Sequence, residues 1–173
     1  MTHILNFPIK EVILKEIVND SFDELFKSSI GVLRIGKDIF LPPQAIGVIL
    51  EKLISNKIIE LFPEWKEGVQ KNEKDVVNTQ NDFYSFEIKT SSSKSGVFGN
   101  RSYGHVSKNK VKNRAGFYLI INYKIPKPND TSYHIHMIRF GWIEDEDWIA
   151  QKSQSGQSAS LSVECKKKLR KLY

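Results

Sequence analysis

The sequence predicts an α/β fold with a mixed central β-sheet flanked by helices. Two observations support this prediction. The chain up to residue 63 places apolar residues at helical spacing, whereas the rest changes to short apolar runs bounded by turn residues. The run 116–123 is continuously apolar, as is typical of a strand covered on both faces. Without a repeat or a linker, residues 1–173 are expected to form one domain, with a core at about 42–143 and a basic tail at 164–173.

Two helices are expected first. Residues 9–27 show helical spacing of apolar side chains, and residues 41–63 show it more strongly. Pro42 and Pro43 can occupy the first turn of the second helix, and Pro63 ends it. The apolar stripe of this helix consists of Ile46, Ile49, Leu50, Leu53, Ile54 and Leu61.

Strands dominate the middle of the chain. Residues 73–78 and 83–90 are expected to form two strands joined by a turn at 79–82. Residues 91–104 are rich in Ser and Gly and predict a loop, and the basic stretch 105–114 predicts a short helix. Two further strands, 116–123 and 132–143, flank a turn at 127–130. Trp148 is expected to begin a last helical piece before the basic tail.

Composition narrows the class of protein. No apolar run approaches the ~20 residues of a membrane span, and the N-terminus carries acids rather than the pattern of a signal peptide. The one cysteine, Cys165, excludes an internal disulfide framework and fits a reducing compartment, so we expect a cytoplasmic protein without a membrane partner. The net charge of +6 permits an anionic partner such as nucleic acid.

Glu87 and Lys89 are the most informative pair of charged residues. They lie two positions apart in an apolar strand, so both side chains point to one face, where each needs a partner. The sequence contains three Glu-x-Lys triplets, and chance alone gives roughly two. The triplet is therefore uninformative without its context, which is a second acid, Asp75, on the neighbouring predicted strand.

If the two strands pair, Asp75, Glu87 and Lys89 converge. Carboxylate oxygens are preferred ligands of Mg²⁺, which usually keeps several waters and takes one or two carboxylates plus a substrate phosphate. Such an ion activates a water, and a nearby lysine orients that water or takes its proton. The constellation therefore favours phosphodiester hydrolysis, and its alternative is an exposed ion pair on a sheet face.

The stretch Asp75 … Glu87-Ile88-Lys89 resembles the motif of the PD-(D/E)xK nuclease superfamily, with Lys74 in place of the first proline. Residues 87–104 and 155–162 are similar to type II restriction endonucleases of the ScaI group. The resemblance implies a single nuclease domain with a restriction-endonuclease-like core that hydrolyses double-stranded DNA at specific sequences, leaving 5′-phosphate and 3′-hydroxyl ends. It also implies Mg²⁺ as the cofactor, held by Asp75, Glu87 and the Ile88 carbonyl, with Lys89 orienting the attacking water.

In this superfamily a preceding helix usually supplies another acid. The second predicted helix offers Glu51, at the flank of its apolar stripe and one turn after Gly47, which leaves space beside it. Glu60 is the rival candidate, and either residue could simply be a solvated helix acid.

The segment after the motif offers candidates for DNA contact, because Asn and Arg read base edges and basic side chains bind phosphate. The candidates are Lys94, Asn100, Arg101, Ser102, Tyr103, Lys108 and Lys110. Each could instead belong to a turn or a solvated face. A palindromic target requires a two-fold enzyme, so we expect a homodimer. The alternatives are a structure-selective nuclease of the same fold, of resolvase or repair type, and a catalytically inactive nucleic-acid-binding domain.

Overall fold

The computed structural model describes residues 6–70, 72–100, 103, 114–150 and 158–173. Its helices are α1 (Glu11–Lys27), α2 (Pro43–Leu61) and α3 (Val163–Lys168). The central sheet consists of β3 (Trp65–Glu67), β4 (Val76–Asn78), β5 (Phe86–Ser91), β7 (Gly116–Lys124), β8 (His134–Ile143) and β11 (Arg170–Lys171). The shorter strands are β1 (Ser29–Ile30), β2 (Leu33–Arg34), β6 (Phe98–Asn100), β9 (Trp148–Ala150) and β10 (Ser158–Leu161).

The central sheet is mixed and is flanked by helices, which confirms the predicted α/β class. Its six strands lie in the order β11-β8-β7-β5-β4-β3. β5 and β7 are parallel, and the other neighbours are antiparallel. A second sheet has three strands in the order β6-β10-β9, and β1 and β2 form a separate hairpin that the sequence did not predict.

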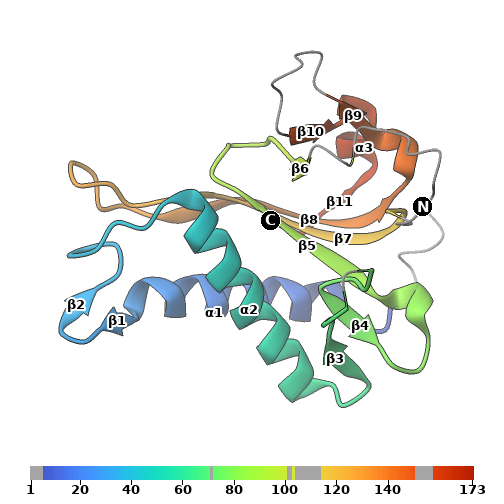
Figure 1. Cartoon of the computed structure of the whole chain (residues 1–173), viewed down its shortest axis with the longest axis horizontal. Helices are drawn as coiled ribbons and strands as arrows, with labels where there is room; N and C mark the ends of the chain where they lie inside the picture. Colours follow the sequence, from blue (N-terminus) through green and yellow to red (C-terminus); the bar gives the residue numbers. More distant parts are fainter. Residues whose placement is uncertain (1–5, 71, 101–102, 104–113, 151–157) are drawn as a thin grey trace.

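Both faces of the central sheet are covered, as expected from the apolar run 116–123. Phe117, Leu119 and Ile121 of β7 pack into the main core with α1 and α2. Tyr118 and Ile120, which point to the other face, pack into a second core with the three-stranded sheet and α3. Figure 1 shows the two long helices on one side of the sheet and the three short strands with α3 on the other.

The C-terminal part of the chain differs from the prediction. Trp148 begins strand β9 rather than a helix, because a 3₁₀ turn at Asp145–Asp147 redirects the chain and the indole packs into the second core. The basic tail is not simply solvated. Cys165 and Leu169 are buried in the second core, and the tail ends in β11, which pairs with β8.

Two smaller expectations need correction, and a third concerns residues that the structure does not describe. Leu61, assigned to the apolar stripe of α2, is 59% exposed, because the helix ends there and the buried stripe closes at Ile58. Within the predicted loop 91–104, residues 98–100 form strand β6. The helix expected at 105–114 lies outside the described residues apart from Arg114.

Within the part of the chain that the structure describes, no helix is long and apolar enough to span a bilayer.

Candidate active site

A tight hairpin brings the motif residues together. β4 and β5 pair antiparallel, as expected for two strands joined by a turn, and Val76 lies opposite Phe86. This register places Asp75, just before β4, beside the first residues of β5. The Ile88 amide donates a hydrogen bond of 2.7 Å to Oδ2 of Asp75. Asp75 is thereby fixed next to the strand that carries Glu87.

Polar side chains close this hairpin. A 3₁₀ helix, η2 (Asp82–Tyr84), lies between the strands. The Asn78 amide donates to Oγ of Ser85 at 3.0 Å, and that hydroxyl donates to Oδ1 of Asp82 at 2.7 Å. The Asn78 side chain in turn accepts from the amides of Gln80 and Asn81. Because Ser85 and Asn78 are both buried, these bonds satisfy polar groups that would otherwise be costly, and they hold the hairpin in one register.

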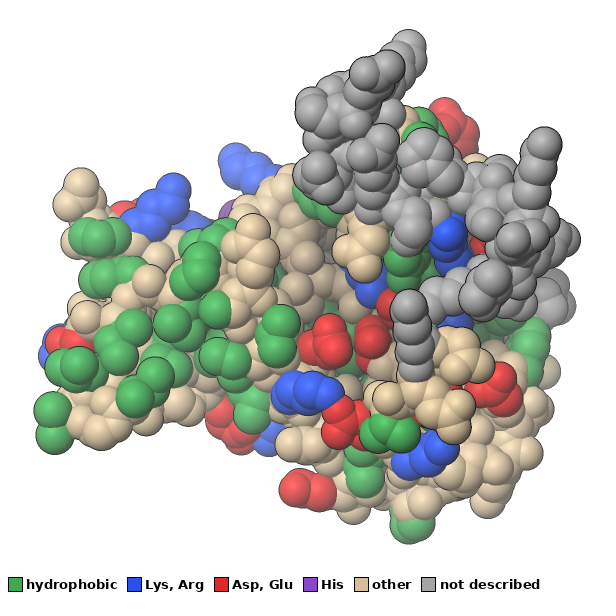
Figure 2. Space-filling model, in the orientation of Figure 1, with side chains coloured by type: hydrophobic (Ala, Val, Ile, Leu, Met, Phe, Trp, Pro, Cys, Tyr) green, Lys and Arg blue, Asp and Glu red, His purple; other side chains and the backbone are tan. Residues whose placement is uncertain are grey.

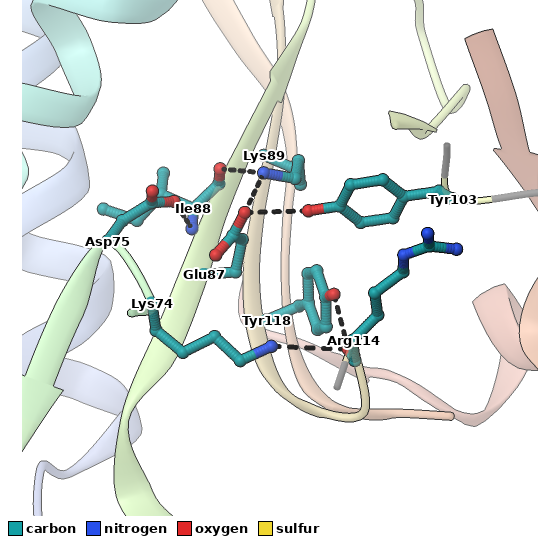
Figure 3. Close-up of polar contacts among 8 residues, drawn as sticks. All are labelled: Lys74, Asp75, Glu87, Ile88, Lys89, Tyr103, Arg114 and Tyr118. Carbon is teal, nitrogen blue, oxygen red and sulfur yellow. Dashed lines mark hydrogen bonds and ion pairs between the residues drawn. The ribbon is translucent and has the colours of Figure 1, made fainter. Parts of the chain in front are cut away.

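Each of the two carboxylates has one oxygen engaged and one oxygen open. Oε1 of Glu87 accepts from Lys89 Nζ at 2.6 Å and from the Tyr103 hydroxyl at 2.9 Å (Figure 3). Lys89 Nζ also donates to the Ile88 carbonyl at 3.3 Å. Among the described residues, neither Oδ1 of Asp75 nor Oε2 of Glu87 has a hydrogen-bond donor. Two negatively charged oxygens and a backbone carbonyl are therefore positioned at the start of β5.

The charges of the site are strongly coupled. Burial, and then the charge of Glu87, raise the pKa of Asp75 above its ordinary value. Burial alone would raise the pKa of Glu87 as well, but the Lys89 ammonium brings it below the ordinary value. Burial opposes the charge of Lys89, yet Glu87 and its neighbours raise the pKa of this lysine. In this arrangement Lys89 is a cation and a hydrogen-bond donor.

Glu51 faces this group of charges from α2. Burial raises its pKa to about 7, and the negative charges of Asp75 and Glu87 act in the same direction. Glu60, by contrast, is exposed, and its charge acts on Lys57 instead. Of the two rival acids, the structure brings Glu51 to the motif.

Gly47 explains how α2 comes so close to β5. A Cβ atom at Gly47 would lie 2.5 Å from Oγ1 of Thr90, the residue after Lys89. Only a residue without a side chain fits at this contact. Because Glu51 lies one turn later on the same face of α2, the close contact at Gly47 holds Glu51 over the site.

The described residues contain no group of three or more Asp, Glu, His or Cys side chains that could hold a metal ion. Glu51 lies beside Asp75 and Glu87, whose charges both act on its pKa. On β8, the exposed His134 and the partly buried His136 contact one another at 3.1 Å. Two carboxylates that leave most coordination positions to water and substrate fit Mg²⁺ better than a closed zinc site, which needs about four protein ligands.

Two residues join the site that the motif alone did not reveal. Lys74, in place of the motif's first proline, is largely buried and lies 5.0 Å from the centroid of the Tyr118 ring. Its Nζ donates to the Arg114 carbonyl at 3.3 Å, and burial lowers its pKa. Tyr103, expected to contact DNA, instead points its hydroxyl at Glu87. No spacing rule in the sequence indicates either contact.

Two of the remaining candidates for DNA contact, Lys94 and Asn100, belong to the part of the chain that the structure describes. Lys94 and Asn100 are exposed, the first in the loop after β5 and the second at the end of β6. Arg101, Ser102, Lys108 and Lys110 lie outside the described residues.

The resemblance found in the sequence is confirmed by comparison with known proteins. A model of the family described as ScaI restriction endonuclease matches residues 2–173. The type II restriction enzyme ScaI of Streptomyces caespitosus is 37% identical over 159 residues, which cover 89% of this chain and 69% of that enzyme. The matched regions include Asp75, Glu87 and Lys89. The chain therefore belongs to the ScaI restriction endonuclease family and is a type II restriction endonuclease, a site-specific DNA hydrolase.

Proposed function

We propose that this chain hydrolyses the phosphodiester bonds of double-stranded DNA in a Mg²⁺-dependent reaction that leaves 5′-phosphate and 3′-hydroxyl ends. The proposal rests on how the carboxylate oxygens of Asp75 and Glu87 are used at the start of β5. Asp75 and Glu87 each keep one oxygen open while their other oxygen is held by protein donors. Carboxylates held in this way are oriented for a cation before it arrives.

In the proposed mechanism Asp75, Glu87 and the Ile88 carbonyl would hold the ion. The bound ion would lower the pKa of a water and offset the charge that develops on the phosphate. Lys89 donates a hydrogen bond to the attacking water and orients it. Its ammonium lies 2.6 Å from Oε1 of Glu87, so it can exchange this carboxylate for the water within the site. Glu51, which is half-buried beside these groups, supports the lysine and the waters around the ion.

We further propose that two copies of the chain act together on a palindromic target. Apolar side chains are exposed on the β1–β2 hairpin, at Ile30, Val32 and Leu33, and on α2 at Val48. Figure 2 shows hydrophobic side chains gathered over this hairpin and the adjoining α2. An exposed apolar surface of this kind is typical of a protein–protein interface, and a second copy of the chain is the occupant that the palindrome requires.

Digestion of plasmid DNA with Mg²⁺, followed by sequencing of the ends, tests the function. Discrete fragments with 5′-phosphate ends support the proposal, whereas cutting of branched DNA alone would favour a structure-selective nuclease. The Asp75→Asn and Lys89→Ala variants should lose cleavage and keep DNA binding. Lys66→Ala is the matched control, because it removes the exposed lysine of another Glu-x-Lys triplet. If Lys89→Ala cuts as well as Lys66→Ala, the mechanism is wrong.

A further inference from the structure

We propose that Tyr103 is a positioning residue for Glu87, through which the small β6-β10-β9 sheet acts on the metal-binding carboxylates. This inference rests on the proposed function. It assigns to Tyr103 a role in the chemistry instead of a contact to DNA.

The contact itself is specific to one oxygen. The Tyr103 hydroxyl donates to Oε1 of Glu87 at 2.9 Å, and Lys89 donates to the same oxygen at 2.6 Å. Two donors on Oε1 fix the rotation of the carboxylate and direct Oε2 away from them. When Lys89 leaves Glu87 to contact water or phosphate, the phenol is the donor that remains. Groups that orient a metal ligand in this way typically contribute about 10- to 100-fold to metal affinity or activity.

The neighbours of Tyr103 fix the position of its ring. Trp148 of β9 packs against it edge-on, with 4.8 Å between the ring centroids and 76° between the planes. The Arg114 guanidinium lies 5.2 Å from the ring centroid, and Lys89 Nζ lies 5.7 Å from it. At Gly99, an added Cβ would lie 2.9 Å from Cγ of Tyr103. The backbone of β6 and the indole of β9 therefore define where the hydroxyl points. Figure 3 shows this hydroxyl directed at Glu87.

The chain that leads from Glu87 to Tyr103 is braced from inside the fold. The buried Asn122 of β7 donates to the carbonyls of Ser93 and Gly96 at 2.9 and 2.8 Å. The buried Arg139 of β8 donates to the carbonyl of Ser95 at 3.1 Å and to Oδ1 of Asn122 at 2.6 Å. This network fixes the loop between β5 and β6 against the central sheet.

Beyond the braced loop, β6 belongs to the small sheet. Asn100 at its end pairs with Ser158 of β10, and its exposed side chain is a candidate for DNA contact. A displacement of this sheet on DNA would move the phenol relative to Glu87, because the ring packs on Trp148 of β9 and against Gly99 of β6. The geometry thus connects the DNA-reading candidate to the orientation of a metal ligand.

The test compares Tyr103→Phe with Tyr133→Phe. Both remove one phenol hydroxyl and keep the ring, and Tyr133 packs on Phe22 and Phe26, away from the site. Mn²⁺ binding in the absence of DNA is measured by electron paramagnetic resonance, and cleavage is measured as kcat, KM and the Mg²⁺ concentration for half-maximal rate. For Tyr103→Phe we expect Mn²⁺ affinity and kcat to fall about 10- to 100-fold, with KM for DNA unchanged. Tyr133→Phe should behave as the parent enzyme.

Gly99→Ala provides a second variant, because it displaces the ring and keeps the hydroxyl. It should weaken Mn²⁺ binding in the same direction as Tyr103→Phe. If Tyr103→Phe binds Mn²⁺ and cleaves DNA like the parent, while Asp75→Asn and Lys89→Ala are inactive, the positioning role is refuted and the proposed function stands. If Asp75→Asn and Lys89→Ala cleave normally, the proposed function fails and this inference fails with it.

Discussion

The close packing of α2 on β5 can be tested at Gly47. In an exposed helix interior, Gly→Ala stabilises the folded state by about 1 kcal/mol, because alanine loses less backbone entropy. At Gly47 the new methyl group would lie 2.5 Å from Oγ1 of Thr90, so the Thr90 side chain or the helix has to shift. Overpacking of this kind typically costs about 1–3 kcal/mol. We expect Gly47→Ala to lower the free energy of unfolding by about 1 kcal/mol.

A double-mutant cycle with Thr90→Ala isolates the cause. Removing the Thr90 hydroxyl and methyl leaves only its Cβ, which lies at an ordinary contact distance of 3.8 Å from a Cβ at Gly47. In the Thr90→Ala background, Gly47→Ala should raise the free energy of unfolding by about 1 kcal/mol, the full difference in helix propensity. The coupling energy between the two substitutions is then about 2 kcal/mol. Urea unfolding followed by circular dichroism measures all four proteins. Asn56→Ala, at an exposed position of α2, controls for helix propensity alone.

Cleavage gives a second measure of the same contact. Thr90 follows Lys89 directly, and Gly47 lies one turn before Glu51, so a shift at this contact displaces two groups of the site. We expect the single Gly47→Ala variant to cleave DNA at least about tenfold more slowly. A Gly47→Ala protein that is more stable by about 1 kcal/mol in both backgrounds, and fully active, would refute the argument from close packing.

Three further predictions concern the core and the surface. Burial raises the pKa of the Cys165 thiol to about 12, so a disulfide reagent at pH 8 should modify it far more slowly in the native protein than in urea; equal rates would place the thiol at the surface. Asn122→Ala removes the side-chain acceptor of Arg139 and should lower the free energy of unfolding by about 2–3 kcal/mol, whereas a change below about 0.5 kcal/mol in urea melts would show that the brace contributes nothing. Val32→Asp, at a side chain that is 96% exposed, should convert a homodimer to a folded monomer in sedimentation experiments, and an unchanged mass would exclude this surface.

The contacts that the sequence could predict are local ones. Asp75 and Glu87 belong to one hairpin, whose two strands are short apolar runs joined by a polar turn. The two-sided burial of β7 follows from its unbroken apolar run. The α/β class and the proximity of Asp75 to the strand of Glu87 were therefore accessible from patterns that span a few residues.

The contacts that escaped prediction depend on pairings between distant segments. Tyr103 reaches Glu87 because β6 pairs with β10, and no periodicity indicates that pairing. The tail 164–173 was identified only as basic, although Cys165 and Leu169 stand four positions apart and are both buried in the second core. A charge count cannot show this, because long charged side chains keep their head groups in water while the apolar residues between them pack.

Helix geometry alone could have decided between Glu51 and Glu60. Glu60 follows Glu51 by nine positions, which is about 2.5 turns of an α-helix, so the two carboxylates point to opposite faces and only one of them can meet β5. An isolated glycine in a helical pattern costs about 1 kcal/mol relative to alanine, and it usually marks a close approach of another segment. Gly47 lies one turn before Glu51 and shares its face. The glycine therefore already identified which face of α2 lies on the sheet, and with it which of the two acids reaches the site.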